Sequence, residues 1–370
     1  KQILMFDGGY GTAIQNRKLT EADYRGDLEL SADQKGNNDL LSLTRPDVIR
    51  DIHTDYLDAG ADMIETNSFS STAIALADYA CEHLVREVNL ASAKVAREAC
   101  DAAEAKDGKR RFVAGAIGPT NKTLSLSPDV NDPGFREVDF DQMKAVYREQ
   151  CDALIEGGVD FLLIETIFDT LNAKVAAMAA AEAAQAAGRE VPIMLSFTVT
   201  DMSGRNLSGH TVEAFWHAVR HVKPIAVGLN CSFGPETLRP YLTALSKAAD
   251  TLILAYPNAG LPNDLGEYDE AAHNANQNAD TPDPKPSAFP TAPVLTVMTK
   301  DFHDNNPEIA EFIGNVSFKT EEMSKLLAWQ GESNASNEEA AVYYLQNNKD
   351  VWAEWLSDDA RGNLSKLLDQ

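Results

Sequence analysis

Cys231 is the residue of this sequence best placed to do chemistry. It follows the apolar run Ala226-Val227-Gly228-Leu229 as part of Asn230-Cys231-Ser232. A buried parallel strand that ends in this way delivers polar side chains to the edge of a sheet. A cysteine there is a candidate thiolate, which can act as a nucleophile or as a metal ligand. A lone cysteine is also commonly just a small buried apolar residue, and the sequence around it leaves both interpretations open.

Few other residues could share a metal with Cys231. The chain contains no CxxC motif and no adjacent cysteine pair; its cysteines are Cys81, Cys100, Cys151 and Cys231. His217 and His221 have metal-site spacing, but no HExxH accompanies them, which favours a solvated helix face. His210 follows Ser208-Gly209 in a predicted loop and stays open, and no GxSxG supports a serine nucleophile.

Asp7-Gly8-Gly9-Tyr10-Gly11-Thr12 lies at the first predicted strand-to-helix turn. Glycines let the backbone turn sharply and direct N–H groups at a ligand, and a helix N-terminus adds positive potential. The motif therefore indicates either a cradle for a carboxylate or phosphate or simply a tight turn. It does not match the GxGxxG fingerprint of dinucleotide-binding proteins.

Glu165 directly follows the aliphatic residues Leu162-Leu163-Ile164. A carboxylate in such surroundings is costly unless it has a partner, and the α-amine of a ligand would supply one. The alternative is a carboxylate that caps the next helix, a role for which Asp169 is better placed. Glu65 occupies the comparable place after an earlier predicted strand.

Short apolar runs alternate with helical patterns from residue 1 to about 257. The runs that we predict to be strands are Ile3–Phe6, Met63–Glu65, Phe112–Ile117, Phe161–Ile164, Pro192–Phe197, Ile225–Leu229 and Thr251–Ala255. Apolar residues at three- and four-residue spacing predict helices between them, such as Val48–Ala59, Met143–Glu156, Val212–Val222 and Leu171–Ala187, the last closed by Gly188. This alternation predicts a parallel sheet covered by helices.

The polar residues follow the apolar runs, which is where an eight-stranded (β/α)8 TIM barrel of about 250 residues places its chemistry. We therefore predict such a barrel over residues 1–270, in preference to a doubly wound sheet. No eighth strand is evident where it should come, so the barrel is predicted to be incomplete.

The composition changes near residue 270. Residues 271–293 are rich in Pro, Asn and Ala and predict a linker. Residues 294–370 predict a small all-helical segment with helices Pro307–Gly314, Thr320–Trp329, Asn337–Gln346 and Asp350–Leu356.

The composition also narrows the choice of partners and compartment. The net charge is −25, which argues against nucleic acid or an anionic membrane surface as a partner. No run of 18 apolar residues predicts a membrane span. The sparse cysteines and the lack of a secretory signal favour the cytoplasm.

Six motifs, in order, resemble the homocysteine-binding domain of cobalamin-dependent methionine synthases, in the homocysteine S-methyltransferase family. They are Asp-Gly-Gly-Tyr-Gly-Thr at 7–12, Glu-Thr-Asn-Ser-Phe at 65–69, Gly-Ala-Ile-Gly-Pro-Thr at 115–120, Phe-Leu-Leu-Ile-Glu-Thr-Ile-Phe-Asp-Thr at 161–170, Gly-Leu-Asn-Cys-Ser at 228–232 and Tyr-Pro-Asn-Ala-Gly-Leu-Pro at 256–262.

The resemblance implies methyl transfer to homocysteine to give methionine. It implies a zinc ion held by Cys231 and an adjacent pair of cysteines, with the homocysteine thiol as the fourth ligand. Methylcobalamin would be the methyl donor, and separate cobalamin- and folate-binding modules would be partners. Asp7, Gly8, Gly9 and Glu165 match positions that hold the amino-acid end of homocysteine, and Asn230 matches a position close to the metal.

The sequence departs from the family pattern because it has no Cys-Cys pair. The alternative function is therefore a catalytically inactive barrel that binds homocysteine or a similar amino acid.

Residues 293–360 resemble the C-terminal end of glycine betaine-type substrate-binding proteins of ABC transporters, through Met298–Phe302, Asn306–Phe312 and Glu338–Leu356. A second alternative is thus a betaine-binding transport module, in which tryptophans cage the quaternary ammonium. We instead expect Trp329, Trp352 and Trp355 to pack between helices.

Overall fold

The computed structural model describes residues 3–129, 131–200, 203–258, 325–326, 329, 337–353, 356 and 360–361. The chain divides into two compact units, Lys1–Pro284 and Lys285–Gln370. The predicted segment boundaries at 270 and 293 lie outside the described residues and stay predictions.

The first unit is built on a parallel sheet whose strands are paired in chain order. Its strands are β1 Met63–Glu65, β2 Phe112–Ile117, β3 Phe161–Ile167, β4 Ile193–Phe197, β5 Ala226–Asn230 and β6 Leu252–Tyr256. Every strand pairs in parallel with the next one along the chain, so all six carboxyl ends lie at the same rim of the sheet.

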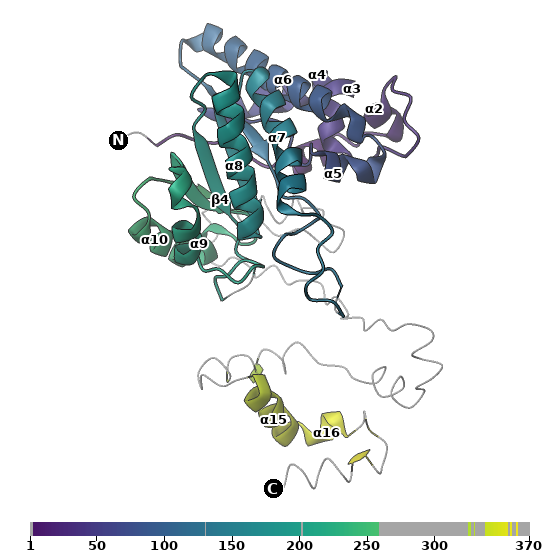
Figure 1. The fold of residues 1–370 in the computed structure, drawn as a ribbon, viewed down its shortest axis with the longest axis vertical. Helices are drawn as coiled ribbons and strands as arrows, with labels where there is room; N and C mark the ends of the chain where they lie inside the picture. The colour runs from purple at the N-terminus through teal and green to yellow at the C-terminus, as the bar shows by residue number, and fades with distance from the viewer. Residues whose placement is uncertain are drawn as a thin grey trace, which may run out of the picture. The chain divides into compact units, whose positions relative to one another are not determined.

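Helices follow the strands, as the alternating pattern predicts. They are α1 Tyr10–Gln15, α2 Glu21–Arg25, α3 Leu41–Thr44, α4 Pro46–Ala59, α5 Ala73–Leu76, α6 Val85–Asp107, α7 Phe140–Glu156, α8 Thr170–Ala187, α9 Val212–Val219 and α10 Pro235–Ala248, with short 3-10 turns η1 Asn38–Leu40, η2 Ala77–Tyr79, η3 Glu82–Leu84 and η4 Arg220–Val222. The long helices α6, α7 and α8 pack against one another in sequence order (Figure 1).

Helix α8 shows why these segments fold as they do. Asp169 caps its first turn by accepting the backbone N–H groups of Leu171 at 2.8 Å and Asn172 at 3.3 Å. Alanine-rich sequence favours the interior of the helix, and Gly188 ends it in the left-handed conformation at φ 65°. Asp169 is therefore the helix cap, which frees Glu165 for another role.

Two apolar layers flank the sheet. The outer layer packs the sheet against the helices. The inner layer takes one buried residue from each strand: Met63, Ala114, Leu163, Met194, Ala226 and Leu254. Side chains alternate between the two faces of a strand, so the residues two positions further on also face inward, just above this layer. Glu65, Glu165 and Tyr256 are among them.

The predicted α/β class and parallel strand order are confirmed, and the sheet is a curled six-stranded half-barrel, consistent with a partial TIM barrel. The predicted first strand, Ile3–Phe6, is wrong in extent. It is reduced to a single bridge between Phe6 and Met63, and Ile3 is 83% exposed. The reason is that these residues pair with β1 on one side only. At the other edge, Leu252 of β6 is 66% exposed.

The second unit contains α15 Asn337–Asn347 and α16 Lys349–Trp352. The prediction for the first of these helices is confirmed to within one residue, whereas the second begins one residue earlier and ends sooner than predicted. The predicted helix Pro307–Gly314, most of Thr320–Trp329, and Trp355 lie outside the described residues.

Two tryptophans of this unit pack as expected. Trp352 is buried, and its indole N–H donates to the carbonyl of Leu345 at 2.6 Å. Trp329 stacks on Tyr343 with ring centroids 3.7 Å apart, so these two faces are covered by each other. The resemblance to a betaine-binding protein stays a prediction. No helix within the described residues is long and apolar enough to span a membrane.

Candidate functional site

A cavity of about 350 Å³ opens at the carboxyl ends of the strands. Gly8, Gly9, Glu165 and Cys231 all line it, although they are far apart in the sequence. The other lining residues are Tyr10, Gly11, Gly36, Asn37, Asn38, Asp39, Glu65, Thr66, Asn67, Phe69, Ser70, Tyr79, Ala116 and Tyr256. The remaining predicted site residues, Asp7 and Asn230, contact these side chains directly.

The cavity wall is acidic. Asp39, Glu65 and Glu165 all line it, and none of its described lining residues is lysine, arginine or histidine. Burial, and then the charge of Asp7, raises the pKa of Glu165 to about 7. A ligand that brings an ammonium group would supply the missing positive charge and favour the ionised acid.

Glu65 and Glu165 are hydrogen bonded to each other. Burial, followed by the charge of Glu165, raises the pKa of Glu65 well above its usual range. Glu65 is therefore the protonated partner, and its hydroxyl donates to the carboxylate of Glu165. Glu165 is thus the acid of the pair that can carry negative charge towards a ligand.

Asn230 holds the end of β5 against its neighbours. Its Oδ1 accepts the backbone N–H of Thr166 at 3.0 Å and the hydroxyl of Ser196 at 2.6 Å. Its Nδ2 donates to Thr166 Oγ1 at 2.7 Å and approaches Cys231 Sγ at 3.2 Å. Asn230 therefore orients the thiol of Cys231 by a direct contact.

The backbone at this rim adopts a costly conformation. Thr166, Cys231 and Ser232 have φ angles of 52°, 58° and 63°, in the left-handed region that non-glycine residues seldom occupy. Each such residue costs on the order of 1–3 kcal/mol and persists where its surroundings impose it. The bonds of Asn230 are part of those surroundings, and the result is a thiol directed at the cavity.

Cys231 does not have the partners of a three-thiolate metal site. Cys81, Cys100 and Cys151 are fully buried, and none of them lines the cavity. Within the described ranges, no group of three His, Cys, Asp or Glu side chains could hold a metal ion. Burial, and then the charge of Glu165, raises the pKa of the Cys231 thiol, which keeps it neutral near pH 7. The donor set therefore does not fit the zinc site that the resemblance implies.

His210 does not supply a ligand either. Its Nδ1 lies 3.2 Å from the hydroxyls of Thr170 and Ser208, and its ring does not line the cavity.

The backbone of Gly8 and Gly9 forms part of the cavity wall. In the described part of the chain, no backbone acceptor pairs with either N–H. A Cβ on Gly8 would lie 2.8 Å from the ring of Tyr56, so a side chain would disturb this wall. Helix α1 is only six residues long, so the free N–H groups themselves, more than a helix dipole, make this wall suitable for a carboxylate.

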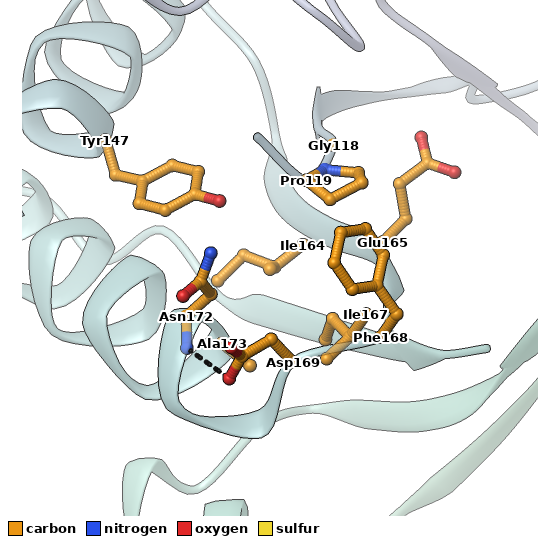
Figure 2. Close-up of a pocket in the computed structure, with 10 residues that line it drawn as sticks. All are labelled: Gly118, Pro119, Tyr147, Ile164, Glu165, Ile167, Phe168, Asp169, Asn172 and Ala173. Atoms are coloured by element: carbon orange, nitrogen blue, oxygen red, sulfur yellow. Dashed lines mark hydrogen bonds between the residues drawn. The ribbon is translucent and has the colours of Figure 1, made fainter. Parts of the chain in front are cut away.

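A second cavity, of about 10 Å³, lies on the other side of Glu165 and is large enough for about one water molecule (Figure 2). Figure 2 shows the Glu165 carboxylate directed away from Tyr147, Asp169 and Asn172, which line this space. The small cavity is thus separate from the acidic one.

Several residues at the site were not predicted from the sequence. Asp39 lies in the 3-10 turn η1 and accepts the backbone N–H of Ser70 at 2.6 Å and the hydroxyl of Ser71 at 2.9 Å. Tyr10 and Tyr256 both donate to Asp7. A signal was present for the two tyrosines, because each belongs to a motif that resembles the family.

Comparison with known proteins shows the family of this chain. The family model for homocysteine S-methyltransferase matches residues 4–314. The chain belongs to the homocysteine S-methyltransferase family. The match reaches beyond residue 270, where we predicted that the barrel ends. Family membership supports methyl transfer to homocysteine in general.

Solved structures of the homocysteine methyltransferase MmuM from Escherichia coli share this fold. The metallated form is 24% identical with a TM-score of 0.56, over 70% of this chain and 85% of that chain. The oxidized form is 23% identical with a TM-score of 0.56, over 75% of this chain and 86% of that one.

Proposed function

We propose that this chain binds homocysteine in the acidic cavity and presents its thiol for methylation to methionine. One observation carries the proposal. Among the residues that the structure describes, N–H groups without a backbone acceptor, an ionisable acid without a cationic partner, and a thiol line one cavity at the rim of the sheet. Together they complement the carboxylate, the ammonium and the sulfur end of a small amino thiol.

The binding roles follow from the charges. The ammonium group would lie at Glu165, because this acid is the ionisable member of its pair. The carboxylate would accept the N–H groups of Gly8 and Gly9. The sulfur would then lie towards Asn230 and Cys231, with Asp7 supporting the wall between these two ends.

Zinc and methylcobalamin enter through the resemblance alone. A zinc ion would stabilise a thiolate at neutral pH, but Cys231 is a single thiol and the described donors do not complete its site. No step of the proposed function is therefore assigned to zinc. Methylcobalamin remains the donor that the resemblance implies, with cobalamin- and folate-binding modules as partners and the cytoplasm as the compartment.

A second candidate function is the binding of homocysteine or a similar amino acid without methyl transfer. It is favoured because Cys231 is the only cysteine of the chain that is not fully buried. This candidate uses the same acidic cavity and differs only in the chemistry at the sulfur end.

Calorimetric titration with homocysteine tests the binding step. Glu165→Gln should weaken binding about tenfold or more, because it removes a charge-assisted hydrogen bond to the ammonium. Glu149→Gln, at an exposed position of α7, is the matched control and should bind as the unchanged protein does. Equal affinities for all three proteins would exclude this cavity as the binding site.

Product formation separates the two candidates. Homocysteine, methylcobalamin and the protein are incubated with and without added zinc, and methionine is measured by mass spectrometry. Methionine above the protein-free rate supports methyl transfer. Homocysteine binding that a chelator leaves unchanged, with no methionine formed, supports the second candidate.

A further inference from the structure

The carboxylate of Asp7 is held by three donors. Tyr10 donates its hydroxyl to Oδ2 at 2.9 Å, and the backbone N–H of Glu65 donates to the same oxygen at 2.7 Å. Tyr256 donates its hydroxyl to Oδ1 at 3.0 Å. Most of the acceptor capacity of this carboxylate is therefore used within the protein, and a ligand ammonium would have to displace one of these donors.

His53 fixes the direction of the hydrogen bond from Tyr10. Its ring is fully buried in α4, and its Nδ1 lies 2.6 Å from the hydroxyl oxygen of Tyr10. Burial lowers the pKa of His53 to about 3, so the ring is neutral. Since the hydroxyl hydrogen of Tyr10 points to Asp7, the hydroxyl oxygen accepts from Nδ1–H of His53, and the hydrogen bonds run from His53 to Tyr10 to Asp7.

Tyr256 approaches Asp7 from the opposite edge of the sheet. Asp7 follows the bridge next to β1, whereas Tyr256 ends β6. The ring of Tyr256 also meets the ring of Phe6 edge to face, with centroids 5.9 Å apart. Side chains thus join the two edges at the rim where the cavity lies.

We infer that Tyr10, His53 and Tyr256 are positioning residues of the binding site, which act by holding Asp7. These four residues are called the Asp7 clasp. Asp7 in turn holds the N–H of Glu65 and begins the turn that carries Gly8 and Gly9. The clasp therefore sets the position of the glycine N–H groups relative to the acids on the opposite wall.

This inference changes the role of Asp7 from a direct ligand contact to a positioning residue. It rests on the proposed function only for the identity of the ligand. The direct contact with the ammonium then falls to Glu165. Besides the hydrogen bond from Glu65, its carboxylate accepts from Asn230 Nδ2 at 3.3 Å and from Thr166 Oγ1 at 3.4 Å, distances longer than those of the three bonds to Asp7.

Amide hydrogen exchange at Glu65 tests the clasp without any ligand. Tyr10→Phe and Tyr256→Phe should each accelerate exchange of this N–H about fivefold, the effect of losing a net hydrogen-bond contribution of about 1 kcal/mol. Tyr147→Phe is the control, because it removes the hydroxyl of a buried tyrosine of α7 that does not belong to the clasp. It should leave the exchange of Glu65 unchanged.

Homocysteine affinity tests whether the clasp positions the site. Tyr10→Phe and Tyr256→Phe should each weaken binding about fivefold, and Tyr147→Phe should not. In an Asp7→Asn background the same tyrosine changes should have a much smaller effect, because both act through Asp7. Equal effects in the two backgrounds would overturn the inference.

His53 offers a rescue experiment. His53→Asn places an amide N–H near the position of Nδ1–H and should keep the affinity close to that of the unchanged protein. His53→Leu removes the donor and should behave like Tyr10→Phe. Two His53 variants with the same affinity would show that the ring acts only by filling space.

The exchange and affinity readouts separate failure of the inference from failure of the proposed function. A protein that binds no homocysteine but shows faster Glu65 exchange in both clasp variants keeps the clasp and loses the proposed ligand. Unchanged Glu65 exchange in Tyr10→Phe and Tyr256→Phe overturns the clasp whatever the ligand is.

Discussion

The hydroxyl of Tyr256 donates to Asp7 Oδ1 over 3.0 Å, although 249 positions separate the two residues. Asp7 follows the single bridge that joins Phe6 to β1, whereas Tyr256 ends β6 at the opposite edge of the described sheet, and β1 and β6 are not paired. The two edges are nevertheless joined at the carboxyl rim by this hydrogen bond. The binding wall thus depends on long-range side-chain contacts as well as on strand pairing.

The close contact between β5 and β6 predicts that a side chain at Gly228 would greatly lower the stability of the fold. A Cβ at this position would lie 1.9 Å from the carbonyl oxygen of Leu254, a backbone atom that cannot move without disturbing β6. Gly228→Ala should lower the free energy of unfolding in urea by about 3 kcal/mol. Gly11→Ala, which meets no atom within 4 Å, should change it little. A Gly228→Ala protein as stable as the unchanged one would show that the strands are further apart than described.

The difference in burial among the cysteines predicts selective thiol reactivity. In the native protein, Ellman's reagent should react with one thiol, that of Cys231, and with four in urea, because the other three cysteines are fully buried. Burial raises the pKa of Cys231, so its rate should still be climbing at pH 9. Cys231→Ser should abolish the native reaction. A second reactive thiol under native conditions would contradict the burial of the remaining cysteines.

The strands of this fold could be read from the sequence because most are buried on both faces. Such strands are continuous apolar runs, and the predicted run Ile225–Leu229 differs from β5 by a single position at each end. The first strand was overpredicted for the same reason. Ile3–Phe6 has the composition of a buried strand, but its pairing is limited to one bridge, which no local pattern reports.

The sequence predicts those site residues whose polarity does not suit their neighbours in the chain. Glu165 follows three aliphatic residues, and that conflict alone indicated an acid in need of a partner. The clasp has no such local signal, because tyrosine and histidine are ordinary residues in a turn or a helix. Their role depends on contacts between Tyr10 and His53, and between Asp7 and Tyr256, which appear only once the sheet has curled.

The raised pKa of Asp39 predicts that the free energy of unfolding depends on pH, and replacing Asp39 by an uncharged residue should remove this dependence. Burial raises its pKa from the ordinary 3.8 to about 6. Between these values the folded chain binds more protons than the unfolded chain, so the free energy of unfolding should fall as pH rises from 4 to 6. Asp39→Asn keeps an acceptor for Ser70 and Ser71 but cannot ionise. Relative to the unchanged protein, its free energy of unfolding should gain about 2 kcal/mol between pH 4 and pH 7, measured by urea unfolding at each pH. Asp51→Asn, at an exposed position, should show no such gain. A difference between Asp39→Asn and the unchanged protein that stays constant across this range would mean that Asp39 is ionised in the folded chain without penalty.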